Sequence, residues 1–390
     1  MLSRRIVTPA YERDMSDLAS AVNAASWLTP AVRALPPYRG PQTIADLRKM
    51  PGRQLPLHLN ESPYPPSPRA IAAARASLDD LNRYPDIHAH ALAGAIAART
   101  GVPASRIVFG VGSDELIQLI CEISLKPGDR CVVPAPSFPR YAVSARLQGA
   151  TPHRVALDAQ GANDAAGLVA AIDARTPLVF SCTPNPPSGG MMDAAALATL
   201  ATDVPATTLL VVDEAYHEFG RHAGGPDMLA GLARRKGPWI ALRTFSKAYA
   251  LAGLRVGYAL CGSEVEAEAL RRAKLQFNVT VPAQAAAFAA IEDQPHLEAT
   301  LAAVAQERER LSAGLRALQL RVYPSAANFV SADLGIPSMP VMQELATRGI
   351  HVRDWRDPEH TTQLRITIGL PAETDAVLTE LRDILRAATR

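Results

Sequence analysis

Short apolar runs alternate with longer Ala- and Leu-rich segments through the middle of the chain, from about Arg69 to Gln284. Short continuous apolar runs are typical of strands buried on both faces of a parallel sheet, and the longer segments have the length of helices. The pattern predicts strands at Arg106–Phe109, Arg130–Val133, Leu178–Ser181, Thr208–Val212, Trp239–Leu242 and Val256–Leu260. We therefore expect residues 69–284 to form an α/β domain with a mostly parallel central sheet covered by helices on both faces.

The two ends of the chain have different patterns. Residues 1–68 are proline-rich and predict an extended arm after one helix at Met15–Ser26, because proline neither continues a helix nor lies in a central strand. Residues 285–317 predict one long helix. The remaining elements are strands at Ala327–Ala332, Ile350–Val352 and Leu364–Ile368 and a helix at Thr374–Ala388. We expect a small α+β domain from residues 285–390, completed by part of residues 1–68.

Composition and charge narrow the classes of protein that fit this pattern. The chain has 390 residues, 48% of them hydrophobic, which is enough for a large core and more than one domain. Lys and Arg (40) balance Asp and Glu (38), so we expect no basic surface for nucleic acid. No apolar run approaches the ~18–20 residues of a membrane span, and the N-terminus lacks the apolar core of a secretory signal. We therefore expect a soluble, cytoplasmic protein that binds neither nucleic acid nor a membrane.

The cysteines are scattered along the chain, with no Cys-x-x-Cys pair. They are Cys121, Cys131, Cys182 and Cys261. In a cytoplasmic protein this spacing predicts reduced core residues, not a disulfide framework or a zinc site. No metal site is expected.

The strongest chemical signal surrounds Lys247, in the segment Thr244-Phe-Ser246-Lys247-Ala-Tyr-Ala-Leu-Ala-Gly253-Leu-Arg255. A lysine amine can form an imine with the aldehyde of pyridoxal phosphate. The Ser246 hydroxyl and the Arg255 guanidinium can hold a phosphate, and arginine does so with two parallel hydrogen bonds. The alternative is a solvated Ser-Lys pair with an exposed arginine. The rest of the chain favours binding of this cofactor.

Two strand ends carry further candidates. The segment Leu209-Leu-Val-Val-Asp213-Glu-Ala-Tyr216 ends an apolar strand with an acid. A pyridine nitrogen needs an anion beside it to stay protonated, and Asp213 fits that role; capping of the next helix is the alternative. After another strand, two glycines precede Ser113 and Asp114. Such a turn can present a helix N-terminus to a phosphate, or Ser113 or Asp114 can simply cap the helix.

These segments, in order from about Ala34 to Leu385, resemble the fold-type I aminotransferases that depend on pyridoxal phosphate. The residues Ala-Leu-Ala-Gly-Leu-Arg that end at Arg255 are most similar to the histidinol-phosphate aminotransferase family. The resemblance implies a fold-type I structure, with a large cofactor-binding domain and a smaller α+β domain built from both termini. The cofactor-binding residues that it implies are Tyr64, Ser113, Asp114, Phe138, Asn185, Asp213, Tyr216, Thr244, Ser246, Lys247 and Arg255.

The resemblance also assigns roles. Lys247 would carry the cofactor and move the proton of the substrate carbon, Asp213 would pair with the ring nitrogen, and Tyr216 would donate to the phenolate oxygen. Phe138 would lie over the ring, where an aromatic face adds ~0.5–1.5 kcal/mol. Tyr64 would reach the cofactor phosphate of a neighbouring subunit, so a homodimer is expected. The implied substrate-binding residues are Tyr38, Asn328, Arg353 and Arg365.

One segment departs from the family pattern Pro-Asn-Asn-Pro-Thr-Gly. The chain has Thr183-Pro-Asn185-Pro186-Pro187-Ser-Gly189, with a proline at the position of the second asparagine. Proline has neither an amide side chain nor an N–H. Either Asn185 shifts to reach the cofactor's phenolate oxygen, or one donor is absent and Tyr216 is the main partner. A cis peptide bond is plausible at one of the two prolines.

The expected reaction exchanges an amino group between a small-molecule donor and a 2-oxo acid. The resemblance favours histidinol phosphate with 2-oxoglutarate, giving imidazole-acetol phosphate and glutamate. A second interpretation keeps the cofactor but changes the substrate or the outcome, as in an aromatic transaminase, a decarboxylase or a cyclase of a specialised pathway; Pro186 favours it. A third, a non-catalytic protein of the same fold, is disfavoured by the intact Lys247, Asp213 and Arg255.

Overall fold

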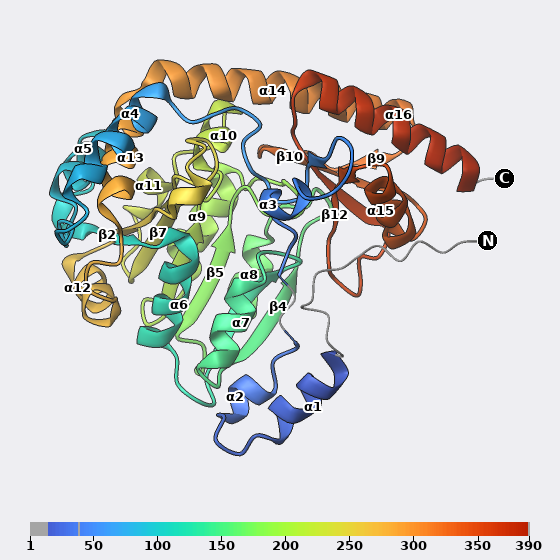
Figure 1. The fold of residues 1–390 in the computed structure, drawn as a ribbon. Helices are drawn as coiled ribbons and strands as arrows, with labels where there is room; N and C mark the ends of the chain where they lie inside the picture. Colours follow the sequence, from blue (N-terminus) through green and yellow to red (C-terminus); the bar gives the residue numbers. More distant parts are fainter. Residues whose placement is uncertain (1–14, 38–39, 389–390) are drawn as a thin grey trace.

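In the computed structural model, which describes residues 15–37 and 40–388, seven strands form the central sheet of a large domain (Figure 1). Their order is β2-β8-β7-β6-β5-β3-β4. The strands are β2 (Ile107–Gly110), β3 (Arg130–Ala135), β4 (Thr151–Ala156), β5 (Leu178–Cys182), β6 (Leu209–Asp213), β7 (Trp239–Thr244) and β8 (Gly257–Cys261). Neighbouring strands run parallel except where β8 pairs with β2 and β7. The prediction of a mostly parallel sheet is confirmed.

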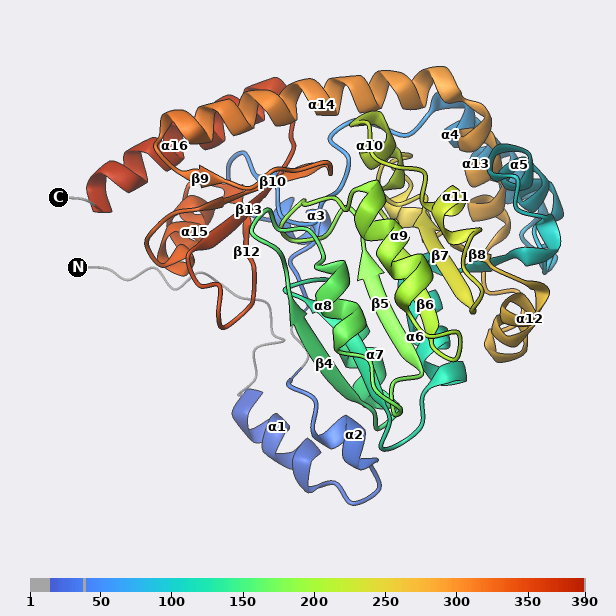
Figure 2. The same ribbon diagram turned by 180° about the vertical axis from the view of Figure 1, so that it is seen from behind.

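Helices cover both faces of this sheet because alternate strand residues point to opposite sides (Figure 2). In β6, Leu210 and Val212 pack in one buried cluster, and Val211 packs in the other. The first cluster includes residues of α4 (Pro68–Ala76), α5 (His90–Thr100), α8 (Ala165–Ala170), α9 (Ala194–Asp203), α11 (Met228–Leu232) and α13 (Val281–Glu292). The second includes residues of α6 (Gly112–Ser124), α7 (Arg140–Leu147) and α12 (Glu264–Ala273). Shorter elements join these layers: η1 (Ser77–Asp80), η2 (Ala104–Arg106), α10 (His217–His222) and η3 (Ala252–Leu254).

Both ends of the chain contribute to a small domain beside the large one. Its antiparallel sheet has the order β12-β13-β10-β9. The elements are β9 (Arg321–Val322), β10 (Phe329–Asp333), α15 (Ser338–Thr347), β11 (Ile350–His351), β12 (Arg353–Asp354), β13 (Gln363–Thr367) and α16 (Pro371–Ala388). Near the N-terminus, β1 (Leu55–Pro56) pairs in parallel with β11. The long helix α14 (Gln294–Ala317) runs along one side of both domains (Figures 1 and 2).

Residues before the large domain are more regular than the predicted extended arm. They form α1 (Met15–Ala24), α2 (Pro30–Arg33) and α3 (Ile44–Leu47). Pro30 occupies the first turn of α2, where its missing N–H costs no hydrogen bond, so proline here starts a helix. Thr43 and Asp46 close the start of α3 with reciprocal hydrogen bonds. The predicted first helix is confirmed but ends before Ser26.

The prediction of one helix over residues 285–317 is wrong. The chain forms α13 and α14, which meet at Asp293, where the backbone leaves the helical region (φ −96°, ψ 64°). Pro295 lies in the first turn of α14, a position that proline favours. The Ser67 hydroxyl donates to the Asp293 carboxylate at 2.5 Å and holds the junction.

One strand of the large sheet was not predicted. β4 lies at the edge of the sheet, and its sequence Thr-Pro-His-Arg-Val-Ala has no continuous apolar run. An edge strand needs neither two apolar faces nor every backbone N–H, so it tolerates Pro152. The other predicted strands are found within one or two residues of their predicted ends. All four cysteines are buried free thiols, as predicted. None of the helices in the described part of the chain combines the length and apolar composition that a membrane crossing requires.

Candidate active site

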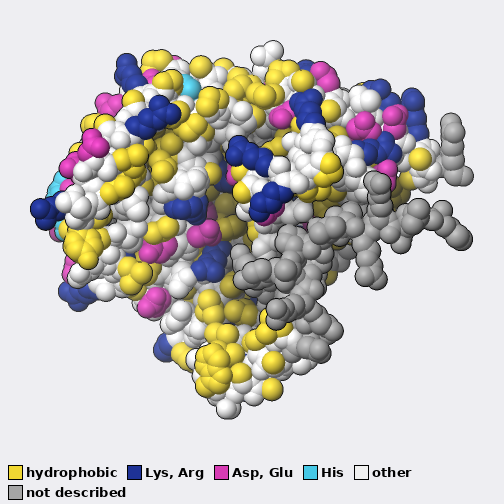
Figure 3. Space-filling model, viewed as in Figure 1, with side chains coloured by type: hydrophobic (Ala, Val, Ile, Leu, Met, Phe, Trp, Pro, Cys, Tyr) yellow, Lys and Arg dark blue, Asp and Glu magenta, His cyan; other side chains and the backbone are white. Residues whose placement is uncertain are grey.

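A cavity of about 580 Å³ lies where the carboxyl ends of the large-domain strands meet the small domain. Figure 3 shows Lys and Arg side chains around a hollow near the centre of this face of the molecule. Parallel strands bring their carboxyl ends to one edge, so residues from distant motifs converge there. The predicted residues that line the cavity are Ser113, Asp114, Phe138, Asp213, Tyr216, Thr244, Ser246, Lys247, Arg255, Arg353 and Arg365.

Lys247 follows the end of β7 and reaches into the cavity from the large domain. Its Nζ donates to the backbone carbonyls of Leu59 (3.1 Å) and Asn60 (3.0 Å) and lies 6.0 Å from the centre of the Tyr216 ring. Burial, and then the nearby Arg365 cation, lower the pKa of Lys247 to about 8. A useful fraction of the amine is therefore neutral near physiological pH, as a nucleophile or base requires.

Asp213 is the last residue of β6 and is almost completely buried. The Tyr141 hydroxyl donates to its Oδ2 at 2.7 Å, and the Ala215 N–H donates to Oδ1 at 2.9 Å. Burial raises the pKa of Asp213 to about 6, although these hydrogen bonds act in the opposite direction. The carboxylate has no cationic partner among the described residues, so a protonated ring nitrogen in the cavity would stabilise its charge.

The start of α6 and the Arg255 side chain form an anion cradle. Arg255, itself in the left-handed region (φ +56°), places Nη1 3.4 Å from the Ser246 hydroxyl and Nη2 3.7 Å from Asp114. Gly112 also has a positive φ (+73°), and a Cβ there would lie 2.4 Å from Arg255 Nη2. Glycine thus lets the guanidinium and the first N–H groups of α6 approach one point beside Ser113, as phosphate binding needs.

These residues fit pyridoxal phosphate. An amine, a buried carboxylate and a phosphate cradle line one cavity, and Phe138 lines it too. Thr244 supports the cradle, because its hydroxyl accepts the Ser246 N–H at 3.1 Å.

Two arginines of the small domain line the other end of the cavity. Arg353 in β12 and Arg365 in β13 are opposite each other across the strand pair. Arg365 donates to the His58 carbonyl at 2.5 Å and lies over the Phe329 ring, but its buried Nε has no partner. Among the described residues Arg353 makes no hydrogen bond or ion pair, and burial, then the neighbouring arginines, lower its pKa to about 10. Both arginines are partly buried cations that pair with no acid among the described residues, and such cations call for an anionic ligand.

Asn60 connects the two ends of the cavity and was not predicted as a site residue. It adopts a positive φ (+54°), which asparagine tolerates better than most residues. Its Nδ2 donates to the Tyr216 hydroxyl at 2.8 Å, and its Oδ1 accepts from the Thr367 hydroxyl at 3.1 Å. Its carbonyl accepts from Asn328 (3.0 Å) as well as from Lys247.

Other site residues escaped sequence reasoning because only tertiary structure reveals them. They include Tyr141, which bonds Asp213, and the cavity-lining residues His58, Trp355 and Arg356. Burial lowers the pKa of His58 to about 4, so this imidazole is neutral at physiological pH. Tyr141 lies in a helix after an apolar strand, a pattern equally typical of a core tyrosine.

The structure does not bring Asn185 to the cavity. Its Nδ2 donates to the Pro136 carbonyl (3.1 Å) and the Ser188 hydroxyl (3.0 Å), and its Oδ1 accepts from Ser137 at 2.6 Å. Pro186 and Pro187 line the cavity instead, with the peptide bond between them cis. All polar groups of the Asn185 side chain are therefore bonded to Ser188 of its own loop and to residues 136–137 after β3, and the shift toward the cavity is not seen.

Three further predicted residues lie elsewhere. Asn328 is buried behind the cavity, where it donates to Asn60, and its Oδ1 has no partner. Tyr64 is half-buried against the core of the small domain and does not line the cavity of its own chain. Tyr38 lies outside the described residues.

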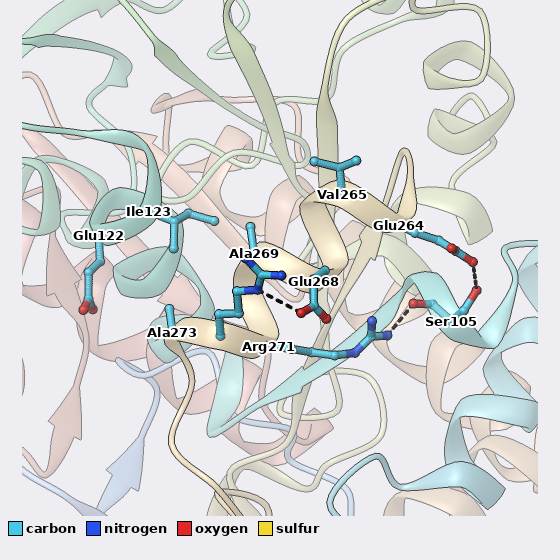
Figure 4. A pocket seen from close by; sticks show the side chains of 10 residues that line it. Ser105, Glu122, Ile123, Glu264, Val265, Glu268, Ala269, Arg271 and Ala273 are labelled. Carbon is cyan, nitrogen blue, oxygen red and sulfur yellow. Dashed lines mark hydrogen bonds and ion pairs between the residues drawn. The ribbon is translucent and has the colours of Figure 1, made fainter.

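A larger cavity, about 980 Å³, lies beside α12 but has different chemistry (Figure 4). Most of its charged side chains have partners nearby: Arg272 pairs with Glu268 at 2.9 Å, and the Ser105 hydroxyl donates to Glu264 at 2.8 Å. None of the predicted site residues lines it. The cavity around Lys247 is therefore the active-site candidate because of its unpaired charged side chains, although it is the smaller of the two.

Comparison with known proteins agrees with this choice. Residues 53–384 match the family model of aminotransferase class I and II. The chain is 38% identical over 363 residues to histidinol-phosphate aminotransferase 2 of Pseudomonas fluorescens, covering 92% of this chain and 97% of that protein. It is 36% identical over 359 residues to histidinol-phosphate aminotransferase of Shouchella clausii, covering 91% and 96%.

A solved structure shows the same relationship in three dimensions. Histidinol-phosphate aminotransferase from Sinorhizobium meliloti, in complex with pyridoxal-5'-phosphate, superimposes with a TM-score of 0.86 at 30% identity, covering 94% of this chain and 99% of that one. This agreement extends over both domains, which confirms the predicted fold-type I architecture. A family model that spans most of the chain, and relatives that match it nearly end to end, show that the protein is an enzyme of the aminotransferase class I and II family.

Proposed function

We propose that the protein uses pyridoxal phosphate to interconvert histidinol phosphate and 2-oxoglutarate with imidazole-acetol phosphate and glutamate. The observation that carries the proposal is the pair of small-domain arginines, Arg353 and Arg365, which share a cavity with Lys247 and lack an anion. The relatives named for histidinol phosphate support the choice of donor. Such a biosynthetic reaction is compatible with the cytoplasmic location expected from the sequence.

The cofactor, when bound, supplies an aldehyde that accepts the amino group and a ring that takes up the electrons of the breaking C–H bond. Lys247 Nζ removes the proton from the amine-bearing carbon of the substrate and later delivers it. A pKa of about 8 suits both steps, because the amine exchanges a proton readily at cellular pH. The Leu59 and Asn60 carbonyls hold Nζ in place.

Asp213 holds positive charge on the ring nitrogen. Its own position is fixed by the Tyr141 hydroxyl and the Ala215 N–H, so the carboxylate does not reorganise as charge develops. Tyr216, held by Asn60, offers a hydroxyl to the cofactor's phenolate oxygen. Ser113, Ser246 and Arg255 hold the cofactor phosphate.

Arg365 and Arg353 bind the acidic end of the substrate. Because Arg365 is fixed by the His58 carbonyl and the Phe329 ring, it can receive an anion without losing further side-chain entropy. A bound anion relieves the mutual repulsion of the two guanidinium groups. The amine of the substrate then points toward Lys247.

The test is a substrate panel with the purified holoenzyme. Histidinol phosphate, histidinol, phenylalanine and aspartate are compared as amino donors, with 2-oxoglutarate as acceptor and glutamate as the measured product. We expect the highest kcat/KM for histidinol phosphate. Equal use of histidinol and histidinol phosphate would contradict the phosphate-binding role of the arginines.

One observation favours a second candidate, a pyridoxal phosphate enzyme that acts on another amino acid. Pro186 and Pro187 line the cavity where an amide donor was expected, and Asn185 is turned away. A missing donor would alter the chemistry of the cofactor oxygen. The same panel separates the candidates, because this one predicts that phenylalanine or another donor exceeds histidinol phosphate.

We further propose that the protein is a homodimer with shared active sites. Large apolar side chains are exposed along one segment: Leu78 (51%), Leu81 (58%) and Tyr84 (80%). Tyr84 stacks on Phe277 with ring centres 4.4 Å apart, and Leu275 nearby is 74% exposed. Exposed apolar residues of this size support a protein–protein interface.

Subunit complementation tests the shared sites. A Lys247→Ala protein is mixed with a Tyr64→Ala protein under conditions that exchange subunits. A hybrid dimer has one intact site if Tyr64 serves the neighbouring subunit, so activity should recover. A monomer by light scattering, or no recovery after proven exchange, contradicts the proposal.

A further inference from the structure

A third arginine lies at the substrate end of the cavity, beside the predicted Arg353 and Arg365. Arg356 lies in the loop between β12 and β13, with its backbone in the left-handed region (φ +50°). Its side chain is exposed and forms no hydrogen bond or ion pair with any described residue. Arginine in this conformation is uncommon, so the surrounding loop must hold it there.

The residue after Arg356 ties the loop to the large domain. Asp357 is buried and pairs with Arg154 of the edge strand β4. It also accepts from the His360 ring and the Glu359 N–H, both at 3.0 Å. One carboxylate therefore fixes the loop by contacts within the loop and across the domain boundary.

The residue before Arg356 ties the loop to the small domain. Trp355 is buried, and its indole N–H donates to the Ser331 hydroxyl at 3.0 Å. Its ring packs between Tyr323 and His360, with ring centres 4.8 and 5.2 Å away. Because both neighbours of Arg356 are anchored, its side chain is held beside the cavity.

The charges at this end of the cavity do not balance. Arg353, Arg356 and Arg365 face one acid in the lining, Asp354, while His58 is neutral. Asp114 and Asp213, the other acids of the lining, lie at the cofactor end. Arg356 is close enough that its charge acts on both other arginines. About two positive charges remain uncompensated, so a monocarboxylate would neutralise only one of them.

We propose that Arg356 is a specificity-determining residue, which makes this end of the cavity select a doubly charged group, a phosphate monoester, over a monocarboxylate. The inference rests on the proposed function and deepens it by assigning the discrimination to a particular side chain. Arg353 and Arg365 suffice to bind one negative charge. Arg356 adds the contact to the second, and Asp357 and Trp355 position it.

Substitution of Arg356 tests the inference, since an exposed side chain can be changed without loss of the fold. Arg356→Gln and Arg356→Lys holoenzymes are compared with wild type, and Arg234→Gln, an exposed arginine outside the cavity lining, is the matched control. With histidinol phosphate we expect KM to rise about 10-fold in Arg356→Gln, or ~1.4 kcal/mol, with kcat within about twofold. The KM for histidinol should not change, and Arg356→Lys should recover part of the loss.

A measurement of anion binding tests the role of Arg356 independently of the proposed reaction, because it needs no turnover. Inorganic phosphate and acetate are titrated into the holoenzyme by calorimetry, with the cofactor site already filled. We expect phosphate to bind more tightly than acetate, and Arg356→Gln to weaken phosphate about 10-fold while leaving acetate unchanged. This result supports the inference even if wild type fails to transaminate histidinol phosphate. Equal loss for both anions, or no loss for either, overturns it even if that transamination is confirmed.

Discussion

The charged side chains at the two ends of the active-site cavity differ in whether they have partners. At the cofactor end the charged groups already have hydrogen-bond or ion-pair partners: Asp213 accepts from the neutral Tyr141 hydroxyl, and Arg255 approaches Asp114 and Ser246. At the substrate end, Arg353 and Arg356 have no hydrogen-bond or ion-pair partner within the described residues. The first arrangement suits a ligand that stays through many turnovers. The second suits a ligand that arrives with its own charge and leaves.

The two ends also belong to different parts of the fold. The cofactor end is built on the carboxyl ends of β6 and β7 and the start of α6, in a sheet with helices on both faces. The substrate end is built on β12, β13 and the loop between them in the small domain. Substitutions at the first end should therefore change kcat most, and those at the second should change KM most.

Loss of Lys247 should have the largest effect. Lys247→Ala removes the amine that moves the substrate proton, so we expect kcat to fall by at least ~10³-fold. Glutamate formation measures the loss. Borohydride should attach the cofactor to Lys247 in wild type but not in Lys247→Ala, and mass spectrometry locates the label. Lys236→Ala, an exposed lysine outside the cavity lining, is the control. Attachment at another lysine would contradict the assignment.

Asp213→Asn should separate activity from stability. We expect kcat to fall by about 10²–10³-fold, since the ring nitrogen loses its anion. Folding raises the pKa of Asp213 from 3.8 to about 6, so the folded state binds more protons between these values, and its stability falls as pH rises through them.

Above pH 6 the buried charge of Asp213 destabilises the folded state by roughly 3 kcal/mol. The cofactor-free Asn variant should therefore unfold at higher urea than wild type at pH 8, with little difference near pH 4. An equal difference at both pH values would show that the charge is not the cause.

Arg365→Ala tests the substrate end of the cavity. A charge-assisted contact to an anion contributes ~1.5–3 kcal/mol, so KM for histidinol phosphate should rise about 10–150-fold while kcat changes less. Arg365→Lys should recover only part, because an ammonium cannot form two parallel bonds. A fall in kcat with KM unchanged would mean that the two ends are not functionally separate.

Tyr141→Phe should have the smallest effect. Its hydroxyl lowers the pKa of Asp213, so its removal should raise that pKa further above 6 and leave more of the carboxyl protonated in mildly acidic buffer. We expect ~3–10-fold weaker retention of the cofactor at pH 6 and little change at pH 8. Absorbance after dialysis at each pH measures it. Equal retention of the cofactor by wild type and Tyr141→Phe at pH 6 would show that Tyr141 does not control the ionisation of Asp213.

Sequence reasoning succeeded where the signal was local. Lys247 and Asp213 lie beside apolar strands in short motifs, and parallel strands with helical crossovers must bring their carboxyl ends together. It missed β4, because an edge strand carries no continuous apolar run. It missed the break at Asp293, because the sequence is rich in Ala on both sides of the break, although Pro295 is typical of a helix start.

The remaining misses depend on contacts between distant segments. Tyr141 and Asn60 acquire their roles from hydrogen-bond partners far away in sequence, Asp213 and Tyr216. Arg356 acquires its role from the cavity that the fold places beside its loop. Asn185 shows the converse: its motif indicated a donor to the cofactor, but Ser137 and Ser188 occupy its polar groups. The partner that such a side chain takes can be predicted only when all the donors and acceptors around it in the folded protein are known.

The contacts of Asn60 have a consequence for the newly made chain. Asn60 and Thr367 are 307 positions apart, yet they share two hydrogen bonds beside Lys247. During synthesis from the N-terminus, the strands that carry Lys247 and Asp213 can pair long before Thr367 emerges from the ribosome. The nascent enzyme can therefore hold a folded sheet while Asn60, and with it the carbonyl that fixes the lysine, still lacks its last partner. A chain truncated before β13 should keep the strands of the large-domain sheet and lose its catalytic activity.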